Sequence, residues 1–247
     1  AKNIISGAGI MTTYNKLIPS DIAEKHQLKQ QLQTVKRSVS HACLYIGLKG
    51  SPEELKLPKT NYWIYPDNID HDTAIDNYVH NLNADFPVVY ISFPSAKDPD
   101  WTNRYPGKST IDIITLLPYD GFKNWDGTKW MKRGEEYEAV KEKISKRLLE
   151  VLFKHIPQAK DKIEHYELST PLTTKHFINY DEGEIYGLDH TPKRFRQKFL
   201  KPRTPIKNFY LTGQDVVTAG VAAALFSGVI TTSAMTGKNI IKKVMKG

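Results

Sequence analysis

The chain has 247 residues, of which 40% are hydrophobic and 25% charged, the balance of an ordinary globular protein with a buried core. Its single cysteine, Cys43, excludes an intrachain disulfide framework and a cysteine-rich metal site. The net charge is +8, but the lysines and arginines are scattered and no nucleic-acid-reading motif accompanies them. We therefore expect no nucleic-acid partner and no metal site.

The first residues, Ala1 to Ser6, contain no apolar core of a signal peptide. A single cysteine is also compatible with a reducing compartment. We therefore expect a cytoplasmic protein, with peripheral contact to a membrane as a further option.

Apolar runs rich in β-branched and aromatic residues alternate with helical patterns along the chain. The predicted strands are 2–7, 41–48, 88–93, 110–117, 163–168 and 209–212. Helices are predicted at 20–36 and at 134–154, where apolar residues recur three and four apart. This pattern indicates a mixed α/β fold, with a mixed β-sheet flanked by helices.

The segment Gly7-Ala8-Gly9 follows the first predicted strand and is a near miss to the dinucleotide fingerprint G-x-G-x-x-G. Thr12 stands where the third glycine is required, and no acid follows a second strand at the required distance. We interpret this segment as a turn between a sheet and a helix.

A second glycine-bearing turn, Gly213 to Gly220, lies between the strand 209–212 and a run of small residues without charge until Lys238. Such a turn directs backbone N–H groups and the positive end of a helix at an anion, while Asp215 can hold a sugar hydroxyl. Asp215 also fits a helix N-cap, a role compatible with ligand binding. By length alone, 216–235 is a candidate apolar membrane anchor.

Five segments, in this order, carry a resemblance to a known family: ISFPSAKDPDWTNRYPGKST (91–110), KRGEEYE (132–138), STPLT (169–173), IYGLDH (185–190) and PIKNFYLTGQDVVTAG (205–220). The chain resembles the C-terminal part of the retinol saturase family, within the phytoene desaturase/carotenoid isomerase group of FAD-dependent oxidoreductases. The resemblance covers nearly the whole chain.

The resemblance implies three parts. Residues 1–19 would end the first FAD-domain segment, 20–200 would form the substrate-binding domain, and 201–247 would supply the C-terminal strand and helix of a split FAD domain. It also implies a set of FAD-binding residues: Gly187, Gly213, Gln214, Asp215, Gly220, Val221 and Ala222. His190 and Tyr186 are the catalytic candidates.

The family's N-terminal G-x-G-x-x-G and its ribose-binding acid are absent from this chain. The resemblance therefore implies a fragment, inactive alone, of an oxidoreductase that acts on C=C bonds of an apolar polyene or lipid by hydride transfer through FAD. NAD(P)H is a candidate electron donor. The residues leave open the substrate, the reaction direction (saturase, desaturase or isomerase) and the oligomeric state. The alternative function is a non-catalytic membrane-associated module that uses 216–235 as its anchor.

Overall fold

The computed structural model describes residues 1–246, and the chain divides into two compact units. One unit is the continuous segment 40–178, and the other combines 1–39 with the chain from 179 onward. These boundaries lie inside those expected at 19/20 and 200/201. The assignment of the units to substrate and to cofactor stays a prediction.

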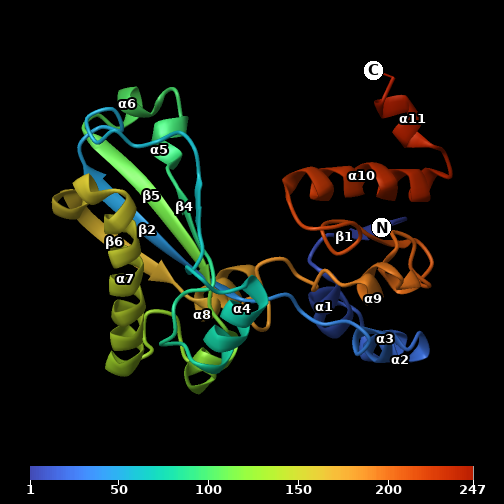
Figure 1. The fold of residues 1–247 in the computed structure, drawn as a ribbon. Coiled ribbons are helices and arrows are strands. Elements are labelled where there is room, and N and C mark those ends of the chain that lie inside the picture. The colour runs from blue at the N-terminus through green and yellow to red at the C-terminus, as the bar shows by residue number, and fades with distance from the viewer. Residues whose placement is uncertain (247) are drawn as a thin grey trace. The chain divides into compact units, whose positions relative to one another are not determined.

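The unit 40–178 is built on a five-stranded sheet in the order β3-β4-β5-β2-β6 (Figure 1). Its strands are β2 (His41–Lys49), β3 (Tyr62–Ile64), β4 (Val89–Ser92), β5 (Lys108–Leu116) and β6 (Ile163–Ser169). The two nine-residue strands β2 and β5 pair along their whole length, from His41↔Leu116 to Lys49↔Lys108. They form the centre of the sheet.

Every pairing in this sheet is antiparallel, so the expected mixed sheet is corrected, while the mixed α/β class of the chain is confirmed. Strand direction depends on which segments become neighbours, and apolar patterning within one strand does not report it. The parallel pairing in this protein lies in the other unit.

Helix α7 (Glu135–His155) packs its apolar stripe onto one face of the sheet (Figure 1). The predicted stripe is confirmed: Tyr137, Ile144 and Leu148 are buried. Acidic residues occupy the first turn of α7, and Lys154 and His155 occupy its last, which matches the helix dipole. The further helices of this unit are α4 (His71–His80), α5 (Pro94–Lys97), α6 (Trp101–Arg104) and α8 (Pro171–Ile178), with 3-10 turns at Tyr119–Trp125 and Pro157–Lys162.

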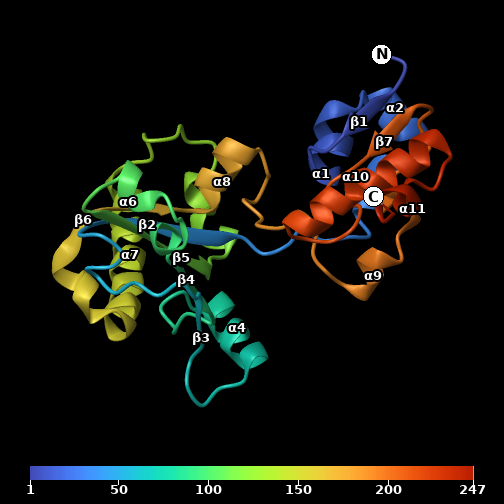
Figure 2. The same cartoon turned by 90° about the horizontal axis from the view of Figure 1, so that it is seen from above.

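The other unit contains a two-stranded parallel sheet, in which β1 (Ile4–Ser6) pairs with β7 (Phe209–Leu211). Figure 2 shows these strands side by side with α10 (Val221–Thr236) packed beside them. Around them lie α1 (Ile10–Thr12), a π-helix at Thr13–Leu17, α2 (Ser20–Lys25), α3 (Leu28–Leu32), α9 (Pro192–Phe195), a 3-10 turn at Lys198–Leu200 and α11 (Ile240–Val244).

The helix predicted at 20–36 is two short helices, because Gln27 adopts a left-handed conformation with φ +53° between them. Several elements were not predicted, among them β3, α4 and α8. In α4 only Ala74 and Tyr78 are buried, which leaves too narrow an apolar stripe to stand out in the sequence.

The apolar run predicted as an anchor at 216–235 forms helix only from Val221, since 213–220 is a turn. At about 1.5 Å per residue, this helix of 16 residues is about 24 Å long, below the roughly 30 Å of a bilayer core. Within residues 1–246, no helix has the length and hydropathy needed to cross a membrane. The anchor interpretation is therefore wrong.

Replacing Leu148 by Ala tests whether α7 organises the unit 40–178. Leu148 is fully buried in the core cluster, so Leu148→Ala is expected to lower the free energy of unfolding by about 3 kcal/mol, measured by urea titration. The matched control is Glu150→Ala on the exposed side of the same helix, expected to change it by less than about 0.5 kcal/mol. Equal effects of the two changes would contradict the packing described.

Candidate functional site

The carboxylate of Asp215 joins three segments that are far apart in the sequence. Its Oδ2 accepts a hydrogen bond of 2.7 Å from the Ile10 backbone N–H, and its Oδ1 accepts one of 3.1 Å from the Leu188 N–H. Asp215 is only 6% exposed. The turn after β1, the turn at 187–190 and the loop after β7 therefore meet at one buried negative charge.

These contacts define which helix Asp215 caps. The helix that follows it in sequence, α10, has Gly220 as its N-cap, with no capping side chain. Ile10 is instead the first residue of α1, so Asp215 satisfies a free N–H of α1 across more than 200 positions. The interpretation of Asp215 as the N-cap of the helix that follows it is therefore wrong.

Arg194 is one residue of this site that the sequence did not reveal. Its side chain is 2% exposed, and it donates to the carbonyl oxygens of Gln214 (2.7 Å) and Leu188 (3.3 Å). Burial lowers the pKa of the guanidinium, while the charges of Asp215 and Asp189 raise it. In the sequence, Arg194 is one cation within a basic stretch, which gave no reason to single it out.

Gly187 is required where the chain approaches Asp215. Its φ is +67°, and a Cβ at this position would lie 2.5 Å from Asp215 Oδ1, closer than real contacts allow. The structure thus brings together the predicted residues Gly187, Gln214 and Asp215. Gln214 also donates through Nε2 to the Tyr180 hydroxyl at 3.1 Å, and burial raises the pKa of that hydroxyl.

Gly213 begins the loop with φ +97°, and its N–H donates to Ser227 Oγ at 2.7 Å. Ser227 lies on α10 and is fully buried, and Thr231, one turn further along, bonds the Leu211 carbonyl at 2.9 Å. Small hydroxyl residues therefore fasten α10 to β7. This explains why a run of small residues, rather than large apolar ones, builds the helix.

The start of α10 is open. Gly220 has φ +102°, no atom lies within 4 Å of the position a Cβ would take there, and Val221 is 88% exposed. Ala222 is also exposed. The predicted residues Gly220, Val221 and Ala222 therefore present the uncapped N–H groups of a long helix beside the Asp215 loop, an arrangement that favours an anion.

His190 holds the end of the loop 213–220 that precedes α10. Its Nε2 accepts a hydrogen bond of 2.8 Å from the Ala219 N–H, so the neutral ring carries its proton on Nδ1. Partial desolvation, followed by the nearby Arg194 charge, lowers the pKa of this histidine, while Asp189 and Asp215 raise it. A catalytic role for His190 stays a prediction.

Tyr186, the second catalytic candidate, is an exposed residue on the same turn. Its ring lies 6.4 Å from that of His190, and its backbone N–H donates to Ser38 Oγ at 2.9 Å. The Tyr186 side chain is therefore largely exposed beside His190. A catalytic role for Tyr186 also stays a prediction.

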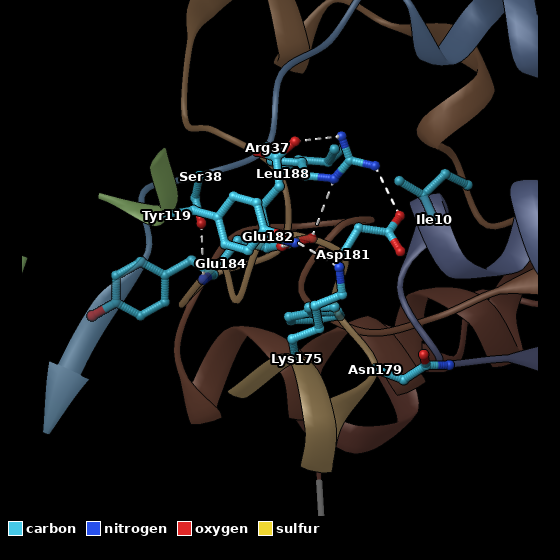
Figure 3. Close-up of polar contacts among 12 residues, drawn as sticks. Ile10, Arg37, Ser38, Tyr119, Lys175, Asn179, Asp181, Glu182, Glu184 and Leu188 are labelled. Carbon is cyan, nitrogen blue, oxygen red and sulfur yellow. Dashed lines mark hydrogen bonds and ion pairs between the residues drawn. The ribbon is translucent and has the colours of Figure 1, made fainter. Parts of the chain in front are cut away.

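An ionic cluster supports the turn that carries Gly187. Figure 3 shows Arg37 among the carboxylates of Asp181, Glu182 and Glu184, at 2.9, 3.4 and 3.6 Å. Glu184 is buried, and burial raises its pKa. The backbone segment that contains Arg37 also pairs with the turn, for example through Ser38 N–H and the Gly187 carbonyl at 2.8 Å.

A glycine pair in this unit tests the close approach at Asp215. Gly187→Ala is expected to lower the free energy of unfolding by about 3 kcal/mol, because it adds a backbone strain of about 1–2 kcal/mol and a clash with Asp215. Gly237→Ala, at φ +69° with no atom within 4 Å, meets only the strain and serves as control. Equal losses in chemical unfolding would show that Asp215 does not constrain this turn.

The His190 contact predicts a pH dependence of the loop. Because the folded-state pKa is lowered, the stabilisation is fully present above the unfolded value of about 6.5 and is lost as the pH falls through the folded pKa. Hydrogen exchange of the Ala219 amide, corrected for intrinsic pH effects, should therefore lose protection on acidification. In His190→Phe, which cannot accept the bond, protection should be low and without this pH step. A step that survives in that variant would contradict the assignment.

No protein-family model matches the chain. An all-trans-retinol 13,14-reductase of Danio rerio is 36% identical over 244 residues, which are 96% of this chain and 40% of that protein. An inactive all-trans-retinol 13,14-reductase of the same organism is 31% identical over 94% of this chain and 39% of its own length.

A more distant relative is prolycopene isomerase 2, chloroplastic, of an Oncidium hybrid cultivar, 26% identical over 93% of this chain and 36% of that protein. The chain thus spans about 40% of the length of the retinol reductases that it matches. The resemblance predicted from the sequence is confirmed: over nearly its whole length, this chain is similar to part of the all-trans-retinol 13,14-reductases.

Proposed function

We propose that this chain is the C-terminal part of an FAD-dependent oxidoreductase that acts on a C=C bond of an apolar polyene. The observation that carries the proposal is the convergence of three segments on Asp215 beside the open start of α10. It gains support from the similarity to proteins named all-trans-retinol 13,14-reductase and prolycopene isomerase.

The residues present fit one half of a flavin dinucleotide site. The N–H groups at Val221 and Ala222 suit a pyrophosphate, because Gly220 leaves space for close approach and no side chain caps this helix. Asp215 keeps the loop in place, since both of its oxygens already accept backbone hydrogen bonds. FAD, when bound, supplies the hydride chemistry, and the chain's own residues hold and orient it.

The parallel pair β1–β7 supports the view that this is half of a site. Parallel strands occur in sheets that are covered on both faces, and an isolated pair is at best marginally stable. In this unit, Ile4 is 53% exposed and Ile5 is exposed as well. We propose that further strands of the complete enzyme extend this sheet and bring the adenine-binding half of the site.

The sheet of the unit 40–178 is the proposed platform for the substrate. Its face opposite α7 carries the edge-to-face pair Trp63 and Tyr90, with ring centroids 4.8 Å apart, and the exposed Tyr45. Flat apolar side chains of this kind suit a conjugated hydrocarbon chain. The electron donor, with NAD(P)H as a candidate, stays a prediction.

The split site predicts how flavin binding depends on this chain. The 247-residue chain alone should retain no flavin on purification, whereas the complete enzyme should carry it, as measured by flavin absorbance per protein. Stoichiometric flavin in the isolated chain would contradict the split site.

Position 221 offers a matched pair of variants within the complete enzyme. Val221→Asp places a negative charge at the helix end proposed for the pyrophosphate and should weaken FAD binding by about tenfold relative to Val221→Asn, its neutral control of equal size. Titration of the apoenzyme with FAD measures both. Equal affinities would show that the pyrophosphate lies elsewhere.

A further inference from the structure

An exposed aromatic cluster in the unit 40–178 shares no residue with the Asp215 site and has no role in the proposed chemistry. The rings of Trp130 and His176 are stacked at 5.5 Å with an interplanar angle of 11°, and Phe177 lies edge-on to both, at 5.2 and 4.8 Å. Phe177 is 63% exposed and Met131 is 75% exposed. We name Trp130, Met131, His176 and Phe177 the Trp130 patch.

The backbone presents this patch at the tip of a turn. The Lys132 N–H donates to the Lys129 carbonyl at 3.0 Å, which makes Trp130 and Met131 the two central residues of a four-residue turn. Met131 has φ +58°, as the third position of a type II turn requires. Two large apolar side chains thus project between two lysines.

The charges around the turn are of one sign. Lys129 and Lys132 are exposed and form no ion pair within residues 1–246, and Arg133 follows directly, its guanidinium over the Tyr137 ring. Segment 129–133 therefore carries three cations and no acid. The nearest acids in the sequence, Asp126 and Glu135, lie outside it, and Asp126 is paired with Lys175 at 2.7 Å.

We propose that the Trp130 patch docks this protein on an anionic lipid bilayer, with Trp130, Met131 and Phe177 in the interface and the flanking cations at the headgroups. Tryptophan favours the boundary between headgroups and acyl chains, and cations beside it add attraction to anionic lipid. Unpaired lysines argue against a protein partner, because lysine is depleted in protein–protein interfaces. The inference does not depend on the proposed flavin chemistry.

Co-sedimentation of the 247-residue chain with vesicles tests the docking. With about a third phosphatidylserine in phosphatidylcholine, the chain should bind, and phosphatidylcholine alone should retain much less. The variant Met131→Ser/Phe177→Ser should lower the partition coefficient by about tenfold, and Lys129→Glu/Lys132→Glu by at least as much. These side chains are exposed, so the variants should keep the wild-type melting temperature.

The matched control is Val221→Ser/Leu225→Ser, which removes two exposed apolar side chains of α10, at 88% and 76% exposure. It should bind vesicles like the wild type. Loss of binding in this control with retention in the patch variants would overturn the proposal and assign the contact to α10. Absence of vesicle binding by the wild type would also overturn it and leave a protein partner as the occupant.

Discussion

The buried carboxylate of Asp215 is the interaction on which the unit containing both chain termini depends. Its side chain is buried, and its two hydrogen bonds come from backbone N–H groups that precede and follow the segment 40–178 in the sequence. An uncompensated charge there would cost several kcal/mol, so the segments that satisfy it are held together by that requirement. The Arg194 guanidinium, held by the Gln214 and Leu188 carbonyls, carries the opposite charge and interacts favourably with Asp215.

The other features of the site follow from this arrangement. Gly187 has to be glycine because Asp215 occupies the space of its side chain, and His190 fixes the far end of the loop through the Ala219 N–H. Ser227 fixes the near end through Gly213. A loop restrained at three points presents the start of α10 in a fixed position without a ligand to organise it.

Much of this could be predicted where local chemistry decides the outcome. The apolar spacing of α7 and the apolar runs of β2 and β5 predicted elements close to their observed bounds, and the glycines at 213 and 220 predicted a turn before α10. Arg194 and Ser227 could not be found, because their roles depend on burial by segments distant in sequence. The same holds for the antiparallel sheet and for the helix that Asp215 caps, which are properties of pairing and not of any one segment.

The parallel pairing of Ile4 with Phe209 has a consequence for the order of folding. The two strands are separated by the whole of 40–178, whose own contacts are contiguous and can form first. In that sheet Cys43 pairs with Ser169. Once the sheet has formed, the chain before Cys43 and the chain after Ser169 start from neighbouring positions, which shortens the effective loop between them. Closing the loop from residue 10 to 215 then costs about 1 kcal/mol less conformational entropy than in the extended chain. The contact between Ile10 and Asp215 is therefore entropically less costly once the sheet of 40–178 has formed.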